Sequence, residues 1–504
     1  MEKKLDILLV SVGNTRKKVY QSLSGSGAFT GLEPPSWLAL TAGYIRKNGF
    51  IVKALDANAE NLDHEDTVNR IKNMDPKYVG IINYGQQANT SAPLMTETRN
   101  LINLIKEKDP GRIVILSGWN PSAIPERTTK EENCDFVIEG EGFYTYLAIL
   151  QGKKLDEVLG LWWKENNEIK HTGRPPTVQD LTNELSEIAW DLLPMDKYRS
   201  FNWLGLRDLD SRNKYASIYT SLGCPFKCKF CAIHATYGER KMRFWKPEWV
   251  LKQIDGLVEN YQIKNLKIND ELFIFNRDHF LAIANGLIER KRSGKYSLNI
   301  AAFARVDSIK EEDLPLLKEA GFNWFELGIE SGSRKVLDLA SKGSYDREKI
   351  KDIVKKIHAK DIDLCANFLF GLPGEDYESM QDTLMLAFEL MPAFPSFFAA
   401  MAPPGSDLYS ECIEKGIPLP KEWIGYAQQG YDFLPLPTEI LSAKEVLRFR
   451  DYAFNAYFRN PAYLQMIEKK FGKKARDHVE EMSKHDLKRK LFETEESENI
   501  NKCC

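Results

Sequence analysis

The chain has 504 residues, which is enough for two or three domains at about 100–200 residues each. Hydrophobic residues make up 43% and charged residues 28%, as in a soluble globular protein, and the formal net charge of -3 argues against a nucleic-acid-binding surface spread over the chain. The apolar run from Leu5 to Val12 is too short to span a bilayer, and no other segment is long and apolar enough to do so. We therefore expect a cytoplasmic protein without a transmembrane segment.

Short apolar runs alternate with amphipathic stretches in the first part of the chain. The runs cover residues 5–12, 51–57, 77–83, 112–118 and 136–140. Buried strands separated by helices predict an α/β domain over residues 1–155, doubly wound and Rossmann-like, with a parallel sheet between two layers of helices. In such a sheet ligands bind at the carboxyl ends of the strands.

A second alternating series begins after residues 156–210, which we interpret as a linker because Pro175 and Pro176 disfavour continuous helix or sheet. Six βα units predict a partial (βα)6 TIM-like barrel over residues 211–402, with its chemistry at the carboxyl ends of the strands. Residues 403–504 form a small, mostly helical C-terminal region. The expected barrel strands are 215–221, 265–270, 297–305, 324–331, 364–371 and 394–401.

Three of the eight cysteines lie close together directly after the first expected barrel strand. Cys224, Cys228 and Cys231 have the spacing C-x3-C-x2-C, which indicates metal binding rather than a disulfide framework. Three thiolates on one loop can bind three irons of a [4Fe–4S] cluster and leave the fourth iron open. His234 offers an alternative, a Cys3His zinc site, although four ligands within eleven residues are crowded for that geometry.

At these cysteines the sequence resembles the radical S-adenosylmethionine (SAM) superfamily, and further segments in the right order extend the resemblance over about residues 215–410. These segments are NDELF (269–273), AFARVD (302–307), GIESGS (328–333), LFGLPGED (369–376) and APPGSDLY (402–409). The resemblance implies a [4Fe–4S] cluster on the three cysteines and SAM on the open iron. It assigns Phe230 to the adenine, Asp270 or Glu271 to the SAM amino group, Arg305 to SAM, and Glu330 and Ser331 to the ribose hydroxyls.

The first 150 residues are similar to those of the cobalamin-binding radical SAM enzymes, a group that includes the anaerobic magnesium-protoporphyrin cyclase and C-methyltransferases. The resembling segments are residues 34–57, 117–126 and 137–145. No Asp-x-His-x-x-Gly motif is present, and we interpret His64, the one histidine of the expected first domain, as a surface residue. The residues expected to meet cobalamin lie in strand-end loops: Gly13, Asn14, Tyr84, Gln86, Gln87, Gly118, Trp119, Asn120, Glu139 and Gly140.

The resemblance implies a cobalamin-dependent C-methyltransferase that acts on an unactivated carbon through a 5′-deoxyadenosyl radical and methylcobalamin. A cyclase or oxidative rearrangement enzyme with the same cofactors remains open, and a zinc-binding scaffold is a remote alternative. A methylthiotransferase is disfavoured because only Cys134 precedes Cys224, whereas that family has an N-terminal cysteine trio. The implied partners are a small-molecule substrate and an external one-electron reductant such as ferredoxin or flavodoxin.

Overall fold

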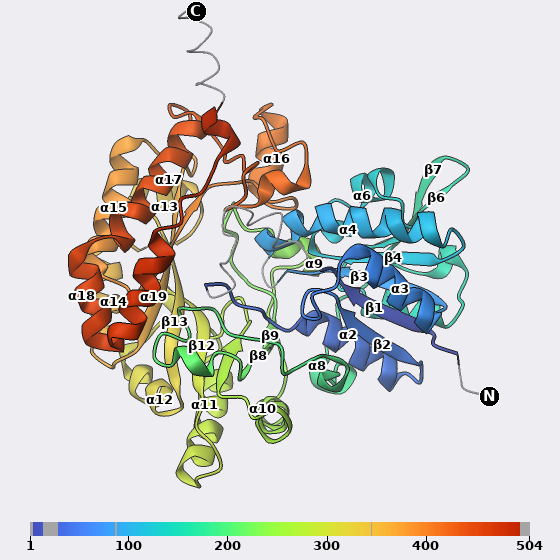
Figure 1. The fold of residues 1–504 in the computed structure, drawn as a ribbon, viewed down its shortest axis with the longest axis horizontal. Helices are drawn as coiled ribbons and strands as arrows, with labels where there is room; N and C mark the ends of the chain where they lie inside the picture. Colours follow the sequence, from blue (N-terminus) through green and yellow to red (C-terminus); the bar gives the residue numbers. More distant parts are fainter. Residues whose placement is uncertain (1–3, 14–28, 86–87, 344, 494–504) are drawn as a thin grey trace, which may run out of the picture.

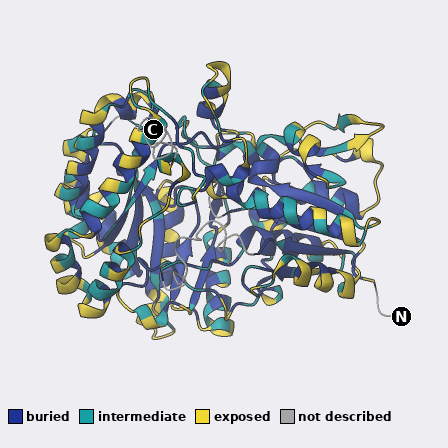
Figure 2. Cartoon of the chain, turned by 45° about the horizontal axis from the view of Figure 1, so that its top comes forward, coloured by how far each residue is buried: buried dark blue, intermediate teal, exposed yellow. Residues whose placement is uncertain are grey.

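The computed structural model describes residues 4–13, 29–85, 88–343 and 345–493. Two α/β units lie side by side, and the N-terminal unit is on the right in Figure 1. The burial colours of Figure 2 place the core along both sheets, whose strands are largely dark blue. None of the described helices is both long enough and apolar enough to cross a membrane.

The N-terminal unit contains a seven-stranded sheet with the order β2-β1-β3-β4-β5-β6-β7. The first five strands are parallel and coincide with the five expected apolar runs, so the doubly wound fold is confirmed. The strand order reverses at β1 and β3, and ligands bind at such a switch point in doubly wound sheets. The strands are β1 (Ile7–Ser11), β2 (Val52–Asp56), β3 (Tyr78–Asn83), β4 (Ile113–Gly118), β5 (Phe136–Ile138), β6 (Leu161–Glu165) and β7 (Glu168–His171).

Helices cover both faces of this sheet, as expected for a doubly wound fold. One pair, α2 and α7, packs together, and α3 packs against α4 (Figure 1). Every residue of α2 from Ser36 to Ile45 is buried, because this helix lies between its own sheet and the second unit, where Ser36 Oγ donates to the carbonyl oxygen of Ser217. The helices are α2 (Ser36–Lys47), α3 (His64–Met74), α4 (Ala88–Lys108), α5 (Trp119–Ala123), α6 (Pro125–Glu131) and α7 (Phe143–Leu150).

The segment that we expected to be a linker, residues 156–210, differs in part from that expectation. Its first residues form β6 and β7, an antiparallel hairpin that extends the N-terminal sheet. The hairpin forms because Leu161 to Trp163 pair with β5 and continue its burial. Pro175 and Pro176 follow the hairpin in irregular structure, and only α8 (Leu181–Glu184) and short turns come after them. The boundaries at residues 155, 210 and 402 stay a prediction.

The second unit is the expected partial barrel of six parallel strands, with the order β15-β14-β13-β12-β11-β8. Each strand overlaps its predicted run, because apolar residues and flanking turns mark both ends. The strands are β8 (Tyr215–Ile218), β11 (Asn265–Ile268), β12 (Asn299–Arg305), β13 (Phe322–Glu330), β14 (Asp363–Phe370) and β15 (Phe394–Ala399). The barrel helices are α10 (Pro247–Tyr261), α11 (Arg277–Arg292), α12 (Leu314–Glu319), α13 (Arg334–Leu339), α14 (Arg347–His358) and α15 (Tyr377–Leu390).

A short hairpin of β9 (Ser221–Leu222) and β10 (Arg243–Phe244) flanks the cysteine loop, and α9 (His234–Tyr237) lies inside it. The C-terminal region is mostly helical, and its helix α17 packs on β14 and β15. Most of the aromatic side chains of α17 and α18 are buried, although Tyr452 is exposed. The C-terminal helices are α16 (Asp407–Glu414), α17 (Ala443–Phe458), α18 (Pro461–Phe471) and α19 (Lys473–Ser483).

Candidate active site

The three clustered cysteines lie on the loop after β8 and β9, at the carboxyl end of the first barrel strand. All three have free, partly buried thiols. Burial raises the pKa of Cys224 to about 11 and that of Cys231 to about 12. These groups are therefore thiols at neutral pH until a metal displaces their protons.

Gly223 and His234 fix the backbone conformation of this loop. Gly223 has a φ of +94°, and a side chain there would collide with the carbonyl oxygen of Lys241 on the other arm of the hairpin. His234 Nε2 lies 2.7 Å from the carbonyl oxygen of Phe226, so this imidazole is already bonded to the loop backbone.

The contact of His234 with the Phe226 carbonyl oxygen disfavours the zinc alternative. Tetrahedral zinc with Zn–S bonds of about 2.3 Å requires thiolates about 3.8 Å apart. No three His, Cys, Asp or Glu side chains of residues 4–13, 29–85, 88–343 and 345–493 gather around a single metal position. A [4Fe–4S] cluster instead spreads its thiolates over three different irons. The donor set of three free thiols fits such a cluster.

Asp270 and Glu271, the two carboxylates expected near SAM, are in different environments. The carboxylate of Asp270 accepts three hydrogen bonds, from Thr220 N and Thr220 Oγ1 at 2.6 Å each and from Ser221 Oγ at 2.7 Å. Glu271 Oε2 is buried without a hydrogen-bond partner in the described part of the chain, and burial raises the pKa of Glu271 to about 8. Asp270 therefore fixes the strand end, and Glu271 has a free oxygen for a cation.

Arg305, at the end of β12, lies directly beside the cysteine loop. Its Nη1 is 3.5 Å from Cys228 Sγ, and its guanidinium carbon is 3.8 Å from the centre of the Phe226 ring. Its Nε donates to Asp307 Oδ1 at 2.9 Å, which fixes the direction of the guanidinium. The expected position of Arg305 near the cluster and SAM is therefore consistent with its contacts.

Glu330 and Ser331, expected at the ribose, have other partners in this structure. Glu330 Oε1 accepts from Lys342 Nζ at 2.7 Å, and Glu330 itself has a φ of +67°, a conformation that side chains rarely adopt. The Ser331 hydroxyl is fully buried and lies 3.1 Å from that of Thr383 on α15. Glu330 is therefore at the site but paired, and the Ser331 side chain is directed to α15.

Lys342 is a buried cation near the cysteine loop that the sequence analysis did not single out. It is buried, its Nζ lies 5.9 Å from the centre of the Phe230 ring, and Glu330 and Cys228 are among the groups that raise its pKa. A single lysine in the loop after α13 gives no periodic signal. Only its position shortly after the GIESGS segment could have indicated it.

The carboxyl ends of β1, β3 and β4 form the edge where cobalamin is expected. Gly13 is buried, and a side chain there would approach the backbone of Ala57 to 2.8 Å. Gly118 has a φ of +130°, and a Cβ there would lie 1.9 Å from the carbonyl oxygen of Asn83. Both positions therefore need glycine. Asn14, Gln86 and Gln87 lie outside the described residues.

Tyr84 and Trp119 belong to an aromatic group between the two units. The Tyr84 ring stacks on Trp37 at 4.4 Å and lies 4.8 Å from Trp119, and its hydroxyl is 3.4 Å from that of Tyr237 in the barrel unit. Trp119 Nε1 and Asn120 Nδ2 are buried donors without a partner among the described residues. Such donors fit the amide carbonyl groups on the rim of a corrinoid.

Glu139, Gly140 and His64 have protein partners. Glu139 Oε2 accepts from Trp162 Nε1 at 2.9 Å, and both backbone groups of Gly140 bond to the Ser122 hydroxyl. His64 Nε2 lies 2.8 Å from Glu97 Oε2 and is only partly exposed, so it is not the free surface residue that we expected.

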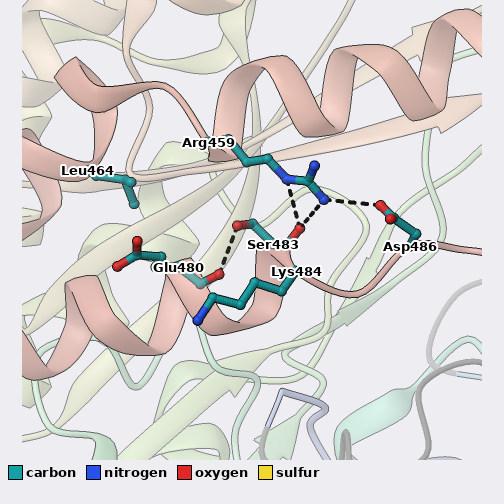
Figure 3. Close-up of a pocket in the computed structure, with 6 residues that line it drawn as sticks. All are labelled: Arg459, Leu464, Glu480, Ser483, Lys484 and Asp486. Carbon is teal, nitrogen blue, oxygen red and sulfur yellow. Dashed lines mark hydrogen bonds and ion pairs between the residues drawn. The ribbon is translucent and has the colours of Figure 1, made fainter.

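A cavity of 430 Å³ lies elsewhere, between the end of α17 and α19. Arg459 crosses it and donates to the Ser483 carbonyl oxygen and to Asp486 (Figure 3). Its residues come only from the C-terminal helices, so it is separate from the cysteine loop. Its lining residues are Arg459, Leu464, Glu480, Ser483, Lys484 and Asp486.

A doubly wound domain faces a parallel barrel whose mouth carries three free thiols and, among the described residues, a buried carboxyl oxygen without a hydrogen-bond partner, an arrangement typical of a cofactor-dependent iron–sulfur enzyme. The pattern of the Radical SAM superfamily matches residues 218–387, and that of the B12 binding domain matches residues 26–150. The chain belongs to the family of radical SAM enzymes that carry a B12-binding domain.

Two curated relatives and one solved structure illustrate this relationship. An uncharacterised methyltransferase of Pyrococcus horikoshii is 30% identical over 78% of this chain and 81% of its own. The anaerobic magnesium-protoporphyrin IX monomethyl ester cyclase of Rubrivivax gelatinosus is 24% identical over 88% and 77%. The fold matches that of the radical SAM methyltransferase TsrM from Kitasatospora setae with a TM-score of 0.68 at 15% identity, over 96% of this chain and 99% of that one.

Proposed function

We propose that this protein is a cobalamin-dependent radical SAM methyltransferase that transfers a methyl group to an unactivated carbon of a small molecule. The observation that carries the proposal is that three thiols outside any disulfide lie at the barrel mouth together with Glu271 Oε2, a buried oxygen without a hydrogen-bond partner among the described residues. Methyl transfer is favoured over cyclisation because the Pyrococcus horikoshii relative, which is named a methyltransferase, is the more similar of the two relatives described above.

Cys224, Cys228 and Cys231 would hold the cluster, and Glu271 would neutralise the SAM ammonium through its free oxygen. Arg305 and Lys342 place two cations beside Cys228, where they would offset the negative charge of thiolates and of the SAM carboxylate. With these groups bound, the cluster and SAM supply a strong hydrogen-atom acceptor, and cobalamin supplies a transferable methyl group.

Gly13 and Gly118 would leave room for the corrinoid at the switch point, and Trp119 and Asn120 would donate hydrogen bonds to it. Phe230 would lie against the adenine, and Glu330 would reach the ribose once Lys342 turns to SAM. We further propose a cytoplasmic enzyme that takes single electrons from a ferredoxin or a flavodoxin.

Anaerobic purification and reconstitution with hydroxocobalamin, followed by iron, sulfide and cobalt analysis, tests the cofactor set. About four irons and one cobalt per chain support the proposal. Cys228→Ala should lose the cluster, whereas His234→Ala should keep most of its iron because His234 only holds the loop. Zinc in place of iron, lost in His234→Ala, would contradict it.

Product analysis separates methyl transfer from cyclisation. A methyltransferase that uses SAM twice releases both S-adenosylhomocysteine and 5′-deoxyadenosine, whereas a cyclase releases 5′-deoxyadenosine without S-adenosylhomocysteine. Incubation with methyl-labelled SAM, a reductant and candidate substrates should give both products and a labelled substrate. 5′-Deoxyadenosine as the only nucleoside product would favour the cyclase alternative.

A further inference from the structure

Toward their carboxyl ends, β14 and β15 alternate between buried and partly exposed residues. Phe368, Phe370 and Phe397 are buried, and their rings pack on each other and on aromatic rings of α17. The residues that alternate with them are only partly buried: Asn367, Leu369, Ser396 and Phe398. Because successive side chains of a strand point to opposite faces, these four lie on the face of the sheet that is turned away from the helices.

Cys365, two residues before Asn367, shows that this face is the interior of the barrel. Its Sγ lies 3.6 Å from Ser396 Oγ. In the parallel register Cys365 is beside Glu326 of β13, whose Oε1 is 3.2 Å from Lys267 Nζ. Lys267 and Glu326 are buried and paired, so they fill the interior on the amino-terminal side of Asn367.

The strand register also brings this face to the expected SAM site. Gly328 of β13 pairs with Asn367, which in turn pairs with Ser396. A side chain at Gly328 would meet Glu330 Oε1 at 2.6 Å and Lys342 Nζ at 2.7 Å, so this position adjoins the pair expected at the ribose. Neighbouring strands are about 4.8 Å apart, so Asn367 is one strand and Ser396 two strands away from that pair.

A substrate must lie close to the same place. Hydrogen transfer to the 5′ carbon, which is attached to the ribose, requires reacting atoms at about 3–3.5 Å. Leu369 packs on the same apolar cluster as Phe230, the residue expected at the adenine. The partly exposed residues of β14 and β15 therefore lie within reach of a molecule that contacts the 5′ carbon.

This face is apolar, with two neutral groups that can form hydrogen bonds. Leu369 and Phe398 supply the apolar surface. The Asn367 amide forms no hydrogen bond with any residue in the described part of the chain. None of the four side chains is charged, and the nearest ions, Glu330 and Lys342, are paired with each other. A charged group placed here would lose its hydration without gaining a counter-ion, which is costly.

We propose that Asn367, Leu369, Ser396 and Phe398 bind the substrate, and we call these four residues the substrate face. The part of the substrate that they contact is uncharged: an apolar skeleton with a carbonyl, amide or hydroxyl group. An asparagine amide can donate to a carbonyl and accept from a hydroxyl or an amide, and the Ser396 hydroxyl can do the same. The inference rests on the proposed function and adds to it the class of small molecule.

The experiment measures the binding of three probes that share one ring and one chain length but differ in charge. They are 4-phenylbutanamide, 4-phenylbutylamine and 4-phenylbutanoate. Equilibrium dialysis against the reconstituted full-length enzyme with SAM, without a reductant, gives a Kd for each and needs no turnover. Wild-type enzyme should bind the neutral amide at least about tenfold more tightly than either ion, because the face offers no free counter-ion.

Two variants test the substrate face itself. Asn367→Asp should reverse the preference, with about tenfold weaker binding of the amide and about tenfold tighter binding of the amine, because a carboxylate replaces a neutral donor. Phe398→Ala should weaken amide binding by about tenfold through the loss of apolar contact. The matched control is Asn323→Asp at the amino end of β13, also partly exposed, which should keep the wild-type preference.

A purely structural role for Asn367 would not produce tighter binding of the amine, and thermal unfolding and iron content check that each variant is folded and loaded. The substrate face would be overturned by equal wild-type binding of all three probes, by no measurable binding of the amide, or by unchanged Kd values in both variants. Failure of the proposed function is distinguishable, because wild-type enzyme would then release no 5′-deoxyadenosine from SAM with dithionite, whatever the probes do.

Discussion

At the scale of single residues, the carboxylates after β11 show how environment separates two similar side chains. Asp270 accepts from three donors at 2.6–2.7 Å, so its charge is already bonded. Glu271 follows it directly and keeps one buried oxygen free. Because burial raises the pKa of Glu271 to about 8, its carboxyl group is mostly protonated at neutral pH until a cation stabilises the ionised form, which is the chemical reason to assign the SAM ammonium to Glu271.

We predict opposite phenotypes for these two carboxylates. Asp270→Asn should lower the stability of the unloaded protein by about 1–3 kcal/mol, because an amide group would face hydroxyl and backbone donors. Glu271→Gln should unfold at the wild-type temperature or above but bind SAM more weakly after reconstitution. Thermal unfolding and SAM titration measure the two effects. Equal SAM affinity in Glu271→Gln and the wild type would remove Glu271 from the SAM site.

Glu375 makes folding stability depend on pH. Its Oε2 accepts from the backbone N–H groups of Gly371 and Leu372, its Oε1 has no partner among the described residues, and burial raises its pKa to about 8. The folded protein therefore keeps a proton that the unfolded chain loses above about pH 4.5. Stability from this group is complete below about pH 4.5, is lost progressively as the pH rises to about 8, and changes no further above it.

Glu375→Gln should remove this pH dependence, because the amide oxygen can still accept from both backbone groups. The melting temperature of the variant relative to the wild type should rise between pH 5 and pH 8 and then level off. Glu271 also titrates near pH 8, but it is present in both proteins and cancels in the difference. A difference that stays constant from pH 5 to pH 9 would show that Glu375 is ionised throughout.

At the scale of elements, the barrel interior contains a buried charge group that spans three segments. Lys267 of β11 lies 3.2 Å from Glu326 Oε1 on β13 and 3.4 Å from Glu33 Oε1, which comes from the segment before α2. The Tyr215 hydroxyl of β8 also donates to Glu33. Burial lowers the pKa of Lys267, but the two carboxylates raise it above its usual value, so the amine stays charged.

Replacing Lys267, the single cation of this group, should lower the free energy of unfolding far more than replacing Glu326, one of its two anions. Lys267→Met leaves two buried carboxylates facing each other and should cost about 3–5 kcal/mol, as measured when buried ion pairs lose one partner. Glu326→Gln keeps the pair of Lys267 with Glu33 and should cost clearly less. Urea unfolding of both unloaded variants measures the difference. Similar losses in the two variants would argue that packing, not charge, determines the cost.

At the scale of the whole molecule, buried polar contacts join the N-terminal unit to the barrel. Arg243 of β10 donates from Nη1 to Glu141 Oε2 at 3.2 Å, and both side chains are at least nine-tenths buried. Glu141 also accepts from the backbone N–H of Val178 at 2.8 Å. The two units, side by side in Figure 1, are thus held in one relative position at the edge where the cofactors are expected to meet.

The effects of replacing Arg243 and Glu141 on the free energy of unfolding should not be additive in a double-mutant cycle. Arg243→Met leaves Glu141 buried without its cation and should destabilise the protein by about 3–5 kcal/mol. The double variant Glu141→Gln with Arg243→Met should recover part of that loss, which gives a coupling energy. Urea unfolding followed by circular dichroism measures it. Additive losses would show that the two side chains do not interact energetically.

The sequence was sufficient for the fold, because apolar runs and turn residues leave local signals, and the spacing of the three cysteines is a local signal of the same kind. Apolar runs between turn residues marked the strands of both sheets, and C-x3-C-x2-C marked three thiols within eight residues, whose role as cluster ligands stays a prediction. The hairpin of β6 and β7 was missed because its exposed residues lack a clear apolar run, and its pairing with β5 supplies the stability. Lys342 was missed because a lone loop lysine has no pattern, and its role arises from its contact with Glu330.

The sequence alone determined the class of this protein, because ligand spacing and apolar periodicity are properties of neighbouring residues. Only the tertiary structure decided which residues are still free to act. It bonded Asp270, Ser331, Glu139 and His64 to protein partners and brought Glu33 to Lys267. It left Glu271 Oε2 and Trp119 Nε1 without hydrogen-bond partners among the described residues. The physical reason is that hydrogen bonds and ion pairs form between groups that are close in space, and the folded chain brings together residues that are far apart in the sequence.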